Sequence, residues 1–333
     1  EDIPPLNFQT IKELTQKGLT ETWRTLGKML TGYMFKELMQ NLHLMGKLLF
    51  LAVLCAMMQN LHSSFEGSGI SQLAYSVCFI FIMVIAFTAF NNSLMLARQS
   101  VDYMVSFMEA LLPLLLSLLA GVGAVTSAAL FTPLILFIVT TTSLIVKNIV
   151  LPLLIMTAVL EGVNYLTDKY NLTNLAGVLK QASLVVMGLS LVVFIGVITV
   201  QGAAGAVADG VTLRAAKYAS TTFIPVVGKM FADTVELVMA ASLLLKNAIG
   251  IFGVVVIGFI CIFPLVKLMA LVIIMKLTGA LVQPMGDERM ARCLDGMGNN
   301  LLLLFGAVIT VVLMYFIVIT MIVGTGSLAV MLR

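Results

Sequence analysis

Continuous apolar stretches of helix length follow one another along most of the chain. The clearest occupy residues 43–61, 70–90, 184–200, 249–274 and 301–323, and each carries few charged side chains. A helix needs about 20 apolar residues to cross a bilayer, whereas a membrane β-barrel shows alternating apolar and polar residues. The pattern therefore predicts an all-α, polytopic integral membrane protein with about six to eight transmembrane or re-entrant helices.

Two further apolar regions leave the number of crossings open. Residues 105–130 contain Glu109 and Pro113 near their start and are rich in glycine and serine near their end, so either a span or a re-entrant hairpin fits them. Residues 131–160 would form a helix of about 45 Å, which is longer than the ~30 Å hydrocarbon core. We therefore expect a break or a kink near residues 147–152.

Polar stretches separate the apolar ones. They occupy residues 62–69, 91–104, 161–180 and 276–300. A polar stretch between two spans is most simply a connection outside the hydrocarbon, because irregular backbone is costly in lipid. We therefore expect the helices to be interrupted at each of these places.

The N-terminal part of the chain has a different pattern. From Ile11 to Leu38, apolar residues recur every three to five positions, with lysines and an arginine among them. Such an amphipathic helix lies on a membrane surface or against the protein body. We therefore divide the chain into an amphipathic helical segment, residues 1–42, and a polytopic transmembrane domain, residues 43–333. Because residue 1 is glutamate, we expect that a leader has been removed or that the numbering starts inside the gene.

Composition supports the membrane assignment and argues against several functions. Hydrophobic residues make up 60% of the chain and charged residues 11%, whereas soluble domains carry about 25% charge. The formal net charge of +3 provides no basic surface of the kind that binds nucleic acid, so we expect no such partner. The four cysteines form no C-x-x-C pair, and we expect them to be small buried hydrophobic residues. Metalloprotease, nucleotide-binding and serine-hydrolase motifs are missing, so we expect no enzymatic activity, cofactor or metal.

Residues 201–246 depart from the apolar pattern. They are rich in small residues and carry the ionisable side chains of Asp209, Arg214, Lys217, Lys229, Asp233, Glu236 and Lys246. A charge at the centre of a membrane helix costs roughly 2.5–3.5 kcal/mol. These groups therefore lie at the water boundary, or they face a wet cavity or a partner within the bilayer. Pro225 and Gly228 predict a helix–break–helix unit.

Two features of this unit have more than one interpretation. Gly202, Ala206 and Gly210 are spaced four residues apart, which places small residues on one helix face. That face forms a subunit contact or a pore wall, or it packs within the chain. The charged residues line a wet cavity or pore, or they belong to an amphipathic hairpin lying in the interface.

A few charged residues lie within the other apolar stretches. Lys147 and Lys267 are single cations, which more often mark a helix end than a translocation path. Asp102 and Glu109 are seven residues apart and share a helix face. They would form a proton relay, or more simply lie at the water boundary.

Several segments resemble one known family. Residues 200–254, which contain the run VQGAAGAVADGVTLRAAKYASTTFIPVVGKM, resemble the signature region of the stage III sporulation protein AE family of endospore-forming Firmicutes. The segments at residues 46–61, 147–160 and 172–180 agree with the same family in order and spacing. The resemblance covers the chain from residue 40 onward.

The resemblance implies a setting and a set of partners. Members of the family are made in the mother cell with a cleaved leader, and they lie in the outer membrane around the engulfed forespore. There they belong to the channel, or feeding-tube, complex that joins the two cells. The implied partners are the other proteins of the same operon, including ring-forming proteins and a cytosolic ATPase, together with a forespore channel protein. The family has no catalytic residues.

Two functional hypotheses follow from these observations. In the first, the protein is a non-enzymatic, homo-oligomeric platform or pore needed for late forespore gene expression, and residues 201–246 line the passage or the subunit contact. A weak similarity in layout to inner-membrane components of conjugative secretion systems, which assemble as small rings, agrees with this. In the second, the protein is a scaffold that recruits the other channel proteins and conducts nothing.

Overall fold

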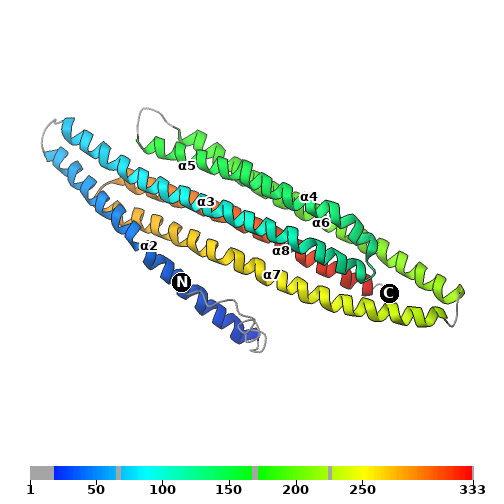
Figure 1. The fold of residues 1–333 in the computed structure, drawn as a ribbon. Coiled ribbons are helices and arrows are strands. Elements are labelled where there is room, and N and C mark those ends of the chain that lie inside the picture. Colours follow the sequence, from blue (N-terminus) through cyan, green and yellow to red (C-terminus); the bar gives the residue numbers. More distant parts are fainter. Residues whose placement is uncertain (1–18, 65–68, 167–171, 224–226, 332–333) are drawn as a thin grey trace. The chain divides into compact units, whose positions relative to one another are not determined.

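The computed structural model describes residues 19–64, 69–166, 172–223 and 227–331, and no strand occurs within these ranges (Figure 1). The helices are α2 (Leu19–Ser64), α3 (Gly69–Gly121), α4 (Val125–Ile145), α5 (Leu151–Leu166), α6 (Thr173–Phe223), α7 (Val227–Val282) and α8 (Glu288–Met331). A π-helical turn, η1 (Val146–Val150), joins α4 to α5, and a 3₁₀ turn, η2 (Gln283–Met285), follows α7.

Six segments of the described ranges are long and apolar enough to cross a membrane. They are Thr31–Met57, Tyr75–Gly121, Val125–Leu166, Thr173–Thr212, Leu237–Met285 and Glu288–Thr325. The prediction of an all-α, polytopic membrane protein is therefore confirmed. All but the first are 38 to 49 residues long, or about 57–74 Å, which is about twice the thickness of the hydrocarbon core.

The helices are longer than the sequence pattern predicted, because polar stretches do not interrupt them. Residues 91–104 lie inside α3, so the expected interruption there is wrong. This stretch contains no glycine or proline, and its buried residues Leu94, Ala97, Val101 and Met104 recur at helical spacing. Its polar residues therefore belong to the outer face of a continuous helix rather than to a loop.

The polar stretch at residues 276–300 is also mostly helical, so the predicted loop there is wrong. α7 continues to Val282 and α8 begins at Glu288, which leaves only η2 and a short turn between them. Gly286 has φ of +91°, a left-handed conformation that glycine adopts without strain, and it reverses the chain in this small space. The stretch at residues 161–180 is helical up to residue 166 and again from residue 173, and residues 167–171 lie outside the described part of the chain.

Other predicted helix boundaries are resolved by the structure. Residues 19–64 form one helix, so the proposed division between residues 42 and 43 is not a helix end; residues 1–18 lie outside the described part of the chain. Residues 105–130 form the tip of a hairpin, because α3 ends at Gly121 and α4 begins at Val125. The distortion expected near residues 147–152 is the π turn η1, in which the Leu151 N–H bonds to the carbonyl of Val146, five residues earlier.

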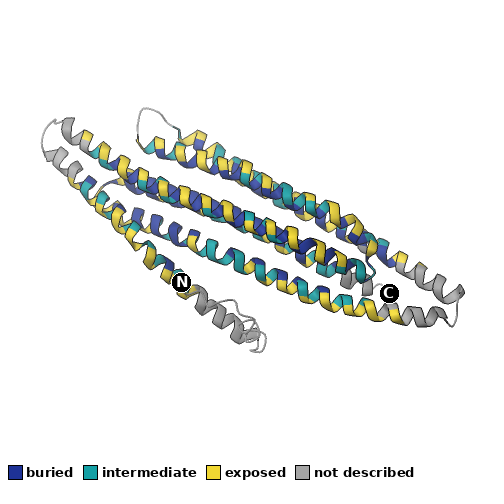
Figure 2. Cartoon of the chain, in the orientation of Figure 1, coloured by how far each residue is buried: buried dark blue, intermediate teal, exposed yellow. Residues whose placement is uncertain are grey.

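The chain divides into two compact units, each of which is described by itself. Unit 1 contains residues 1–85 and 266–298, and unit 2 contains residues 86–265 and 299–333. In unit 2, α6 packs antiparallel to α4 and α5. Along the helices, buried and exposed residues alternate at helical spacing (Figure 2).

The buried face of each helix is closely filled by large apolar side chains. In unit 2 these include Tyr315, Phe131, Met108, Leu112 and Leu115, each less than 2% exposed. Dispersion contacts and tight packing hold membrane helices together, because lipid tails are as apolar as the side chains themselves. Cys55, Cys261 and Cys293 are buried, as predicted, and Cys78 is half-buried.

Candidate functional site

Five of the described glycines of unit 2 lie so near a residue of another helix that a Cβ atom would collide with it. The pairs are Gly121 with Ser242, Gly202 with Met321, Gly205 with Ser127, Gly250 with Val323, and Gly253 with Leu111. Small residues allow helix backbones to approach closely in a membrane. We call these pairs, which join α3, α4, α6, α7 and α8, the glycine junction.

Asp209 of α6 caps the first turn of α4 within this junction. Its carboxylate accepts hydrogen bonds from the Thr126 N–H at 2.8 Å and from the Ser127 N–H at 3.0 Å, and Asp209 is 1% exposed. The first N–H groups of a helix have no partner within the helix. The residue before α4 is Ala124, which has no side chain that could cap it. The acceptor therefore comes from another helix.

The chemistry of this cap is favourable for a buried carboxylate. The positive end of the α4 dipole faces the negative charge of Asp209, and hydrogen bonds to an ionised acceptor are about twice as strong as neutral ones. Gly205 lies one turn before Asp209, where a Cβ atom would be 2.5 Å from Ser127 Oγ and 3.3 Å from Ser127 Cα. The glycine lets α6 come near enough for Asp209 to reach the N–H groups.

Lys246 joins α7 to α8 at the same junction. The side chain is fully buried, and Nζ donates a hydrogen bond of 2.9 Å to the carbonyl of Val323. Gly250, one turn further along α7, touches the side chain of Val323. A buried cation and a closely packed glycine thus fix one stretch of α8 against α7.

The structure describes some of the residues predicted for this site and not others. Gly202, Asp209, Gly210 and Lys246 are buried. The described contact of Gly202 is with Met321 of the same chain. For the other candidates only the helical backbone is described, and their side chains lie outside the described part of the chain: Ala206, Arg214, Lys217, Lys229, Asp233 and Glu236.

The helix–break–helix unit itself is seen in the backbone. α6 ends at Phe223 and α7 begins at Val227. Residues 224–226, which include Pro225, lie outside the described part of the chain. Sequence reasoning placed Asp209 in this unit but missed its partners, Thr126 and Ser127. The signal for a distant cap was the absence of any capping side chain before α4.

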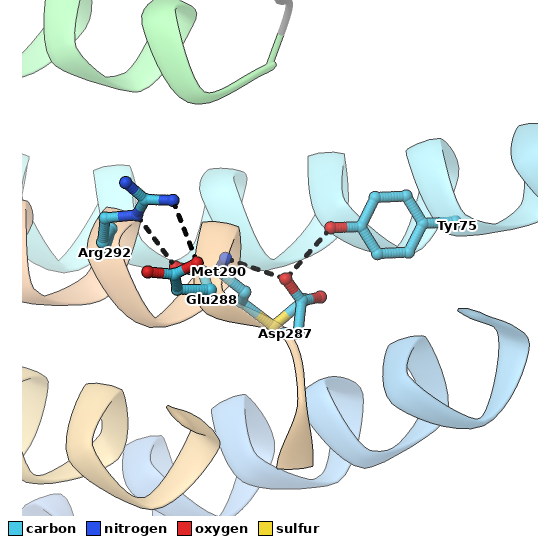
Figure 3. Close-up of polar contacts among 5 residues, drawn as sticks. All are labelled: Tyr75, Asp287, Glu288, Met290 and Arg292. Carbon is cyan, nitrogen blue, oxygen red and sulfur yellow. Dashed lines mark hydrogen bonds and ion pairs between the residues drawn. The ribbon is translucent and has the colours of Figure 1, made fainter. Parts of the chain in front are cut away.

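A second buried carboxylate lies in unit 1 and was also missed (Figure 3). Asp287 caps α8 from the preceding turn: its Oδ1 accepts hydrogen bonds from the Met290 N–H at 3.0 Å and from the Tyr75 hydroxyl at 3.2 Å. The first bond is a local N-cap, which the sequence Gly-Asp-Glu-Arg-Met makes recognisable. The exposed pair of Glu288 and Arg292, 3.4 Å apart, adds little to stability.

Replacing Asp209 tests the cap. Asp209→Ala leaves the N–H groups of the half-buried Thr126 and the buried Ser127 without an acceptor, which costs about 1–3 kcal/mol for each group that is buried. Thermal unfolding of the detergent-solubilised protein should show a clearly lower melting temperature, and Asp209→Asn, which keeps one acceptor oxygen, should show a smaller loss. Thr212→Ala, at an exposed position of the same helix, is the control. A melting temperature for Asp209→Ala equal to that of the unsubstituted protein would contradict the assignment.

Replacing Gly205 tests the close approach of α6 to α4. A Gly205→Val side chain collides with Ser127, so overpacking should destabilise the protein by about 1–3 kcal/mol. Gly188 lies on the same helix, and a Cβ atom added there would meet nothing within 4 Å. Gly188→Ala should therefore be neutral or stabilise the helix by up to about 1 kcal/mol. Equal unfolding temperatures for the Gly205→Val and Gly188→Ala proteins would show that α6 does not approach α4 in this way.

Comparisons with known proteins agree with the resemblance seen in the sequence. The family described as stage III sporulation protein AE matches residues 7–326. The stage III sporulation protein AE of Bacillus subtilis (strain 168) is 40% identical over 306 residues, which cover 92% of this chain and 77% of the relative. No solved structure matches the chain. The chain therefore belongs to the stage III sporulation protein AE family.

Proposed function

We propose that this sporulation protein is a non-enzymatic, homo-oligomeric membrane component of the channel between mother cell and forespore. It lies in the mother-cell-derived outer forespore membrane and forms a platform or pore needed for late forespore gene expression. Its partners are the other proteins of the same operon, including ring-forming proteins and a cytosolic ATPase, and a forespore channel protein. Family membership supports the sporulation role, and the surface of unit 2 supports the oligomer.

The observation that carries the oligomer is the length of the apolar outer face of α6. Large exposed apolar side chains recur along this helix, namely Leu175, Val178, Leu184, Val185, Leu189, Val192, Val193, Val200, Val207 and Val211. From Leu175 to Val211 the helix is about 54 Å long. Even at a tilt of about 40°, near the upper limit for membrane helices, it would span about 41 Å, against ~30 Å of hydrocarbon.

The neighbouring α4 and α5 have the same excess of apolar surface. Exposed apolar side chains extend from Val125 through Phe137, Leu144 and Met156 to Leu166, a distance of about 60 Å along the helices. Lipid covers only part of such a surface, and exposing the remaining apolar side chains to water is unfavourable. Further copies of the chain, related by closed symmetry, would cover the same surface on every subunit.

The first test is the mass of the particle. The full-length chain, purified in detergent and analysed by native mass spectrometry, should be present as a complex of several copies. Introducing a charge at the α6 face, as in Val200→Glu, should shift the complex toward single copies, because an unpaired buried charge is costly at an interface. Thr212→Gln, at an exposed position of the same helix, should leave the mass unchanged. A single-copy particle for the unsubstituted protein would contradict the oligomer.

The second test concerns sporulation. Cells whose only copy carries Asp209→Ala should lose late forespore gene expression, because the glycine junction loses the cap of α4. Cells with Thr212→Ala should retain it. Solute flux through vesicles containing the purified protein then separates a pore from a scaffold, since a scaffold leaves the bilayer tight. Normal late gene expression in the Asp209→Ala cells would remove the junction from the proposed function.

A further inference from the structure

The outer face of α3 in unit 2 is polar, although this helix belongs to the apolar segment Tyr75–Gly121. Its exposed polar residues are Asn91, Asn92, Arg98, Gln99, Tyr103, Ser106, Glu109 and Ser117, and Asp102 is partly exposed. They recur at spacings of three, four and seven residues, so they lie on one face of the helix. We call these nine residues the α3 stripe. The opposite face is buried and apolar, with Met104, Met108, Leu112 and Leu115.

The outer face of α6, in the same unit, has the opposite character. Its exposed residues in the segment Thr173–Thr212 are mostly apolar, and half of them are valine or leucine, such as Leu189, Val192 and Val200. A helix that faces lipid or a tightly packed neighbour has this composition. Within unit 2, the outer face of α6 is therefore suited to an apolar surrounding, whereas the outer face of α3 is not.

Lipid is an unsuitable surrounding for the α3 stripe. A crossing needs about 20 residues. Residues 70–90 of the same helix could supply a crossing without charge, but any crossing within the unit 2 part of the helix, residues 86–121, includes charged members of the stripe. If it begins at Ala86 it contains Arg98 and Asp102, and if it ends at Gly121 it contains Asp102 and Glu109. Each charge at the centre of a helix in lipid costs roughly 2.5–3.5 kcal/mol. Where the unit 2 part of α3 crosses the membrane, a polar medium must therefore meet this face.

The backbone of α3 adds to the polarity of the stripe. Pro113 is exposed and lies inside the helix. It has no N–H to donate to the carbonyl of Glu109, four residues earlier, and Glu109 is itself an exposed residue. An unsatisfied carbonyl costs several kcal/mol in hydrocarbon, but water satisfies it.

Polar contacts along the stripe are open to the outside. Gln99 Nε2 donates a hydrogen bond of 2.9 Å to the Tyr103 hydroxyl, and both residues are exposed. Lys147, in the π turn η1, forms an ion pair with Asp102, whose side chain is 49% exposed. Ion pairs at membrane depth face a bundle interior or a water-filled cavity, and π turns are frequent at functional sites.

We infer that the α3 stripe lines a water-filled passage that admits small hydrophilic solutes, an inference that rests on the proposed function. A protein surface would be the other polar neighbour. Protein interfaces, however, are depleted of charge at their centres and enriched in aromatic residues. The stripe has charges of both signs, namely Arg98, Asp102 and Glu109, and Tyr103 is its one aromatic residue. This composition fits water better than a packed interface.

Thiol labelling tests the inference directly. The full chain, with its native cysteines replaced by alanine, carries one new cysteine at a time: Asn92→Cys, Ser106→Cys or Ser117→Cys in the stripe, and Val185→Cys or Val192→Cys on α6 as matched controls. Each is reconstituted into vesicles of phosphatidylethanolamine and phosphatidylglycerol and treated with a charged, membrane-impermeant methanethiosulfonate. Because the thiolate forms in water and not in lipid, the stripe cysteines should react at least about tenfold faster than the α6 cysteines.

Three outcomes would overturn the inference. Stripe cysteines that react only after detergent solubilisation would lie against lipid or protein. Equal reaction on α3 and α6 would remove the difference between the two faces. Disulfide cross-linking of stripe cysteines between copies would make the stripe a subunit contact.

A second measurement needs no substitution. Hydroxyl radicals generated in water should oxidise Tyr103 and Met95, which are more than half exposed on α3, and spare the buried Met187 of α6. Protection of Tyr103 and Met95 in lipid vesicles would likewise contradict a water-exposed stripe.

The proposed oligomer and the passage-lining role of the stripe can fail independently. Single-copy particles whose stripe is labelled would refute the oligomer. An oligomer whose stripe is not labelled would refute only the passage-lining role.

Discussion

Hydrocarbon supplies no hydrogen-bond donors or acceptors, so each polar group at membrane depth needs a partner from the protein or from water. The glycine junction shows how this requirement shapes the chain. α4 begins after an alanine and has no local cap, so Asp209 of α6 supplies the acceptor, and Gly205 makes room for it. Lys246 in turn bonds to a carbonyl of α8. At Asp209, an ionisable residue in an apolar chain is the partner of backbone N–H groups that have no acceptor within their own helix. At Lys246, a buried charge has a backbone carbonyl of another helix as its partner.

The same requirement separates the outer faces of unit 2. The apolar segments of unit 2 are about twice as long as the hydrocarbon core is thick, so part of their surface lies beyond the hydrocarbon. α6 exposes aliphatic side chains that favour lipid or another subunit, and α3 exposes amides, hydroxyls and charges that favour water. A ring of copies that meets lipid and its neighbours through one face and encloses water with the other would satisfy both surfaces at once.

The sequence predicts the helical class and most of the apolar helices, because long apolar runs have few other solutions. The prediction fails where a polar stretch of a continuous helix has the composition of a loop. Residues 91–104 stay helical because Leu94, Ala97 and Val101 keep one helix face buried. Arg98 and Gln99 lie on the exposed face. The cap formed by Asp209 joins residues 83 positions apart, and no local pattern encodes such a contact. The cap formed by Asp287 was readable, since its backbone partner Met290 is three residues away.

The account depends most on the claim that the helices of unit 2 extend beyond the bilayer and are covered there by other copies. An electron cryomicroscopy map of the full chain in lipid nanodiscs measures this directly. The account predicts several copies, with α6 extending past the lipid density and its outer valines packed against a neighbouring subunit. A single copy, with lipid density along α6 from Leu175 to Val211, would contradict it.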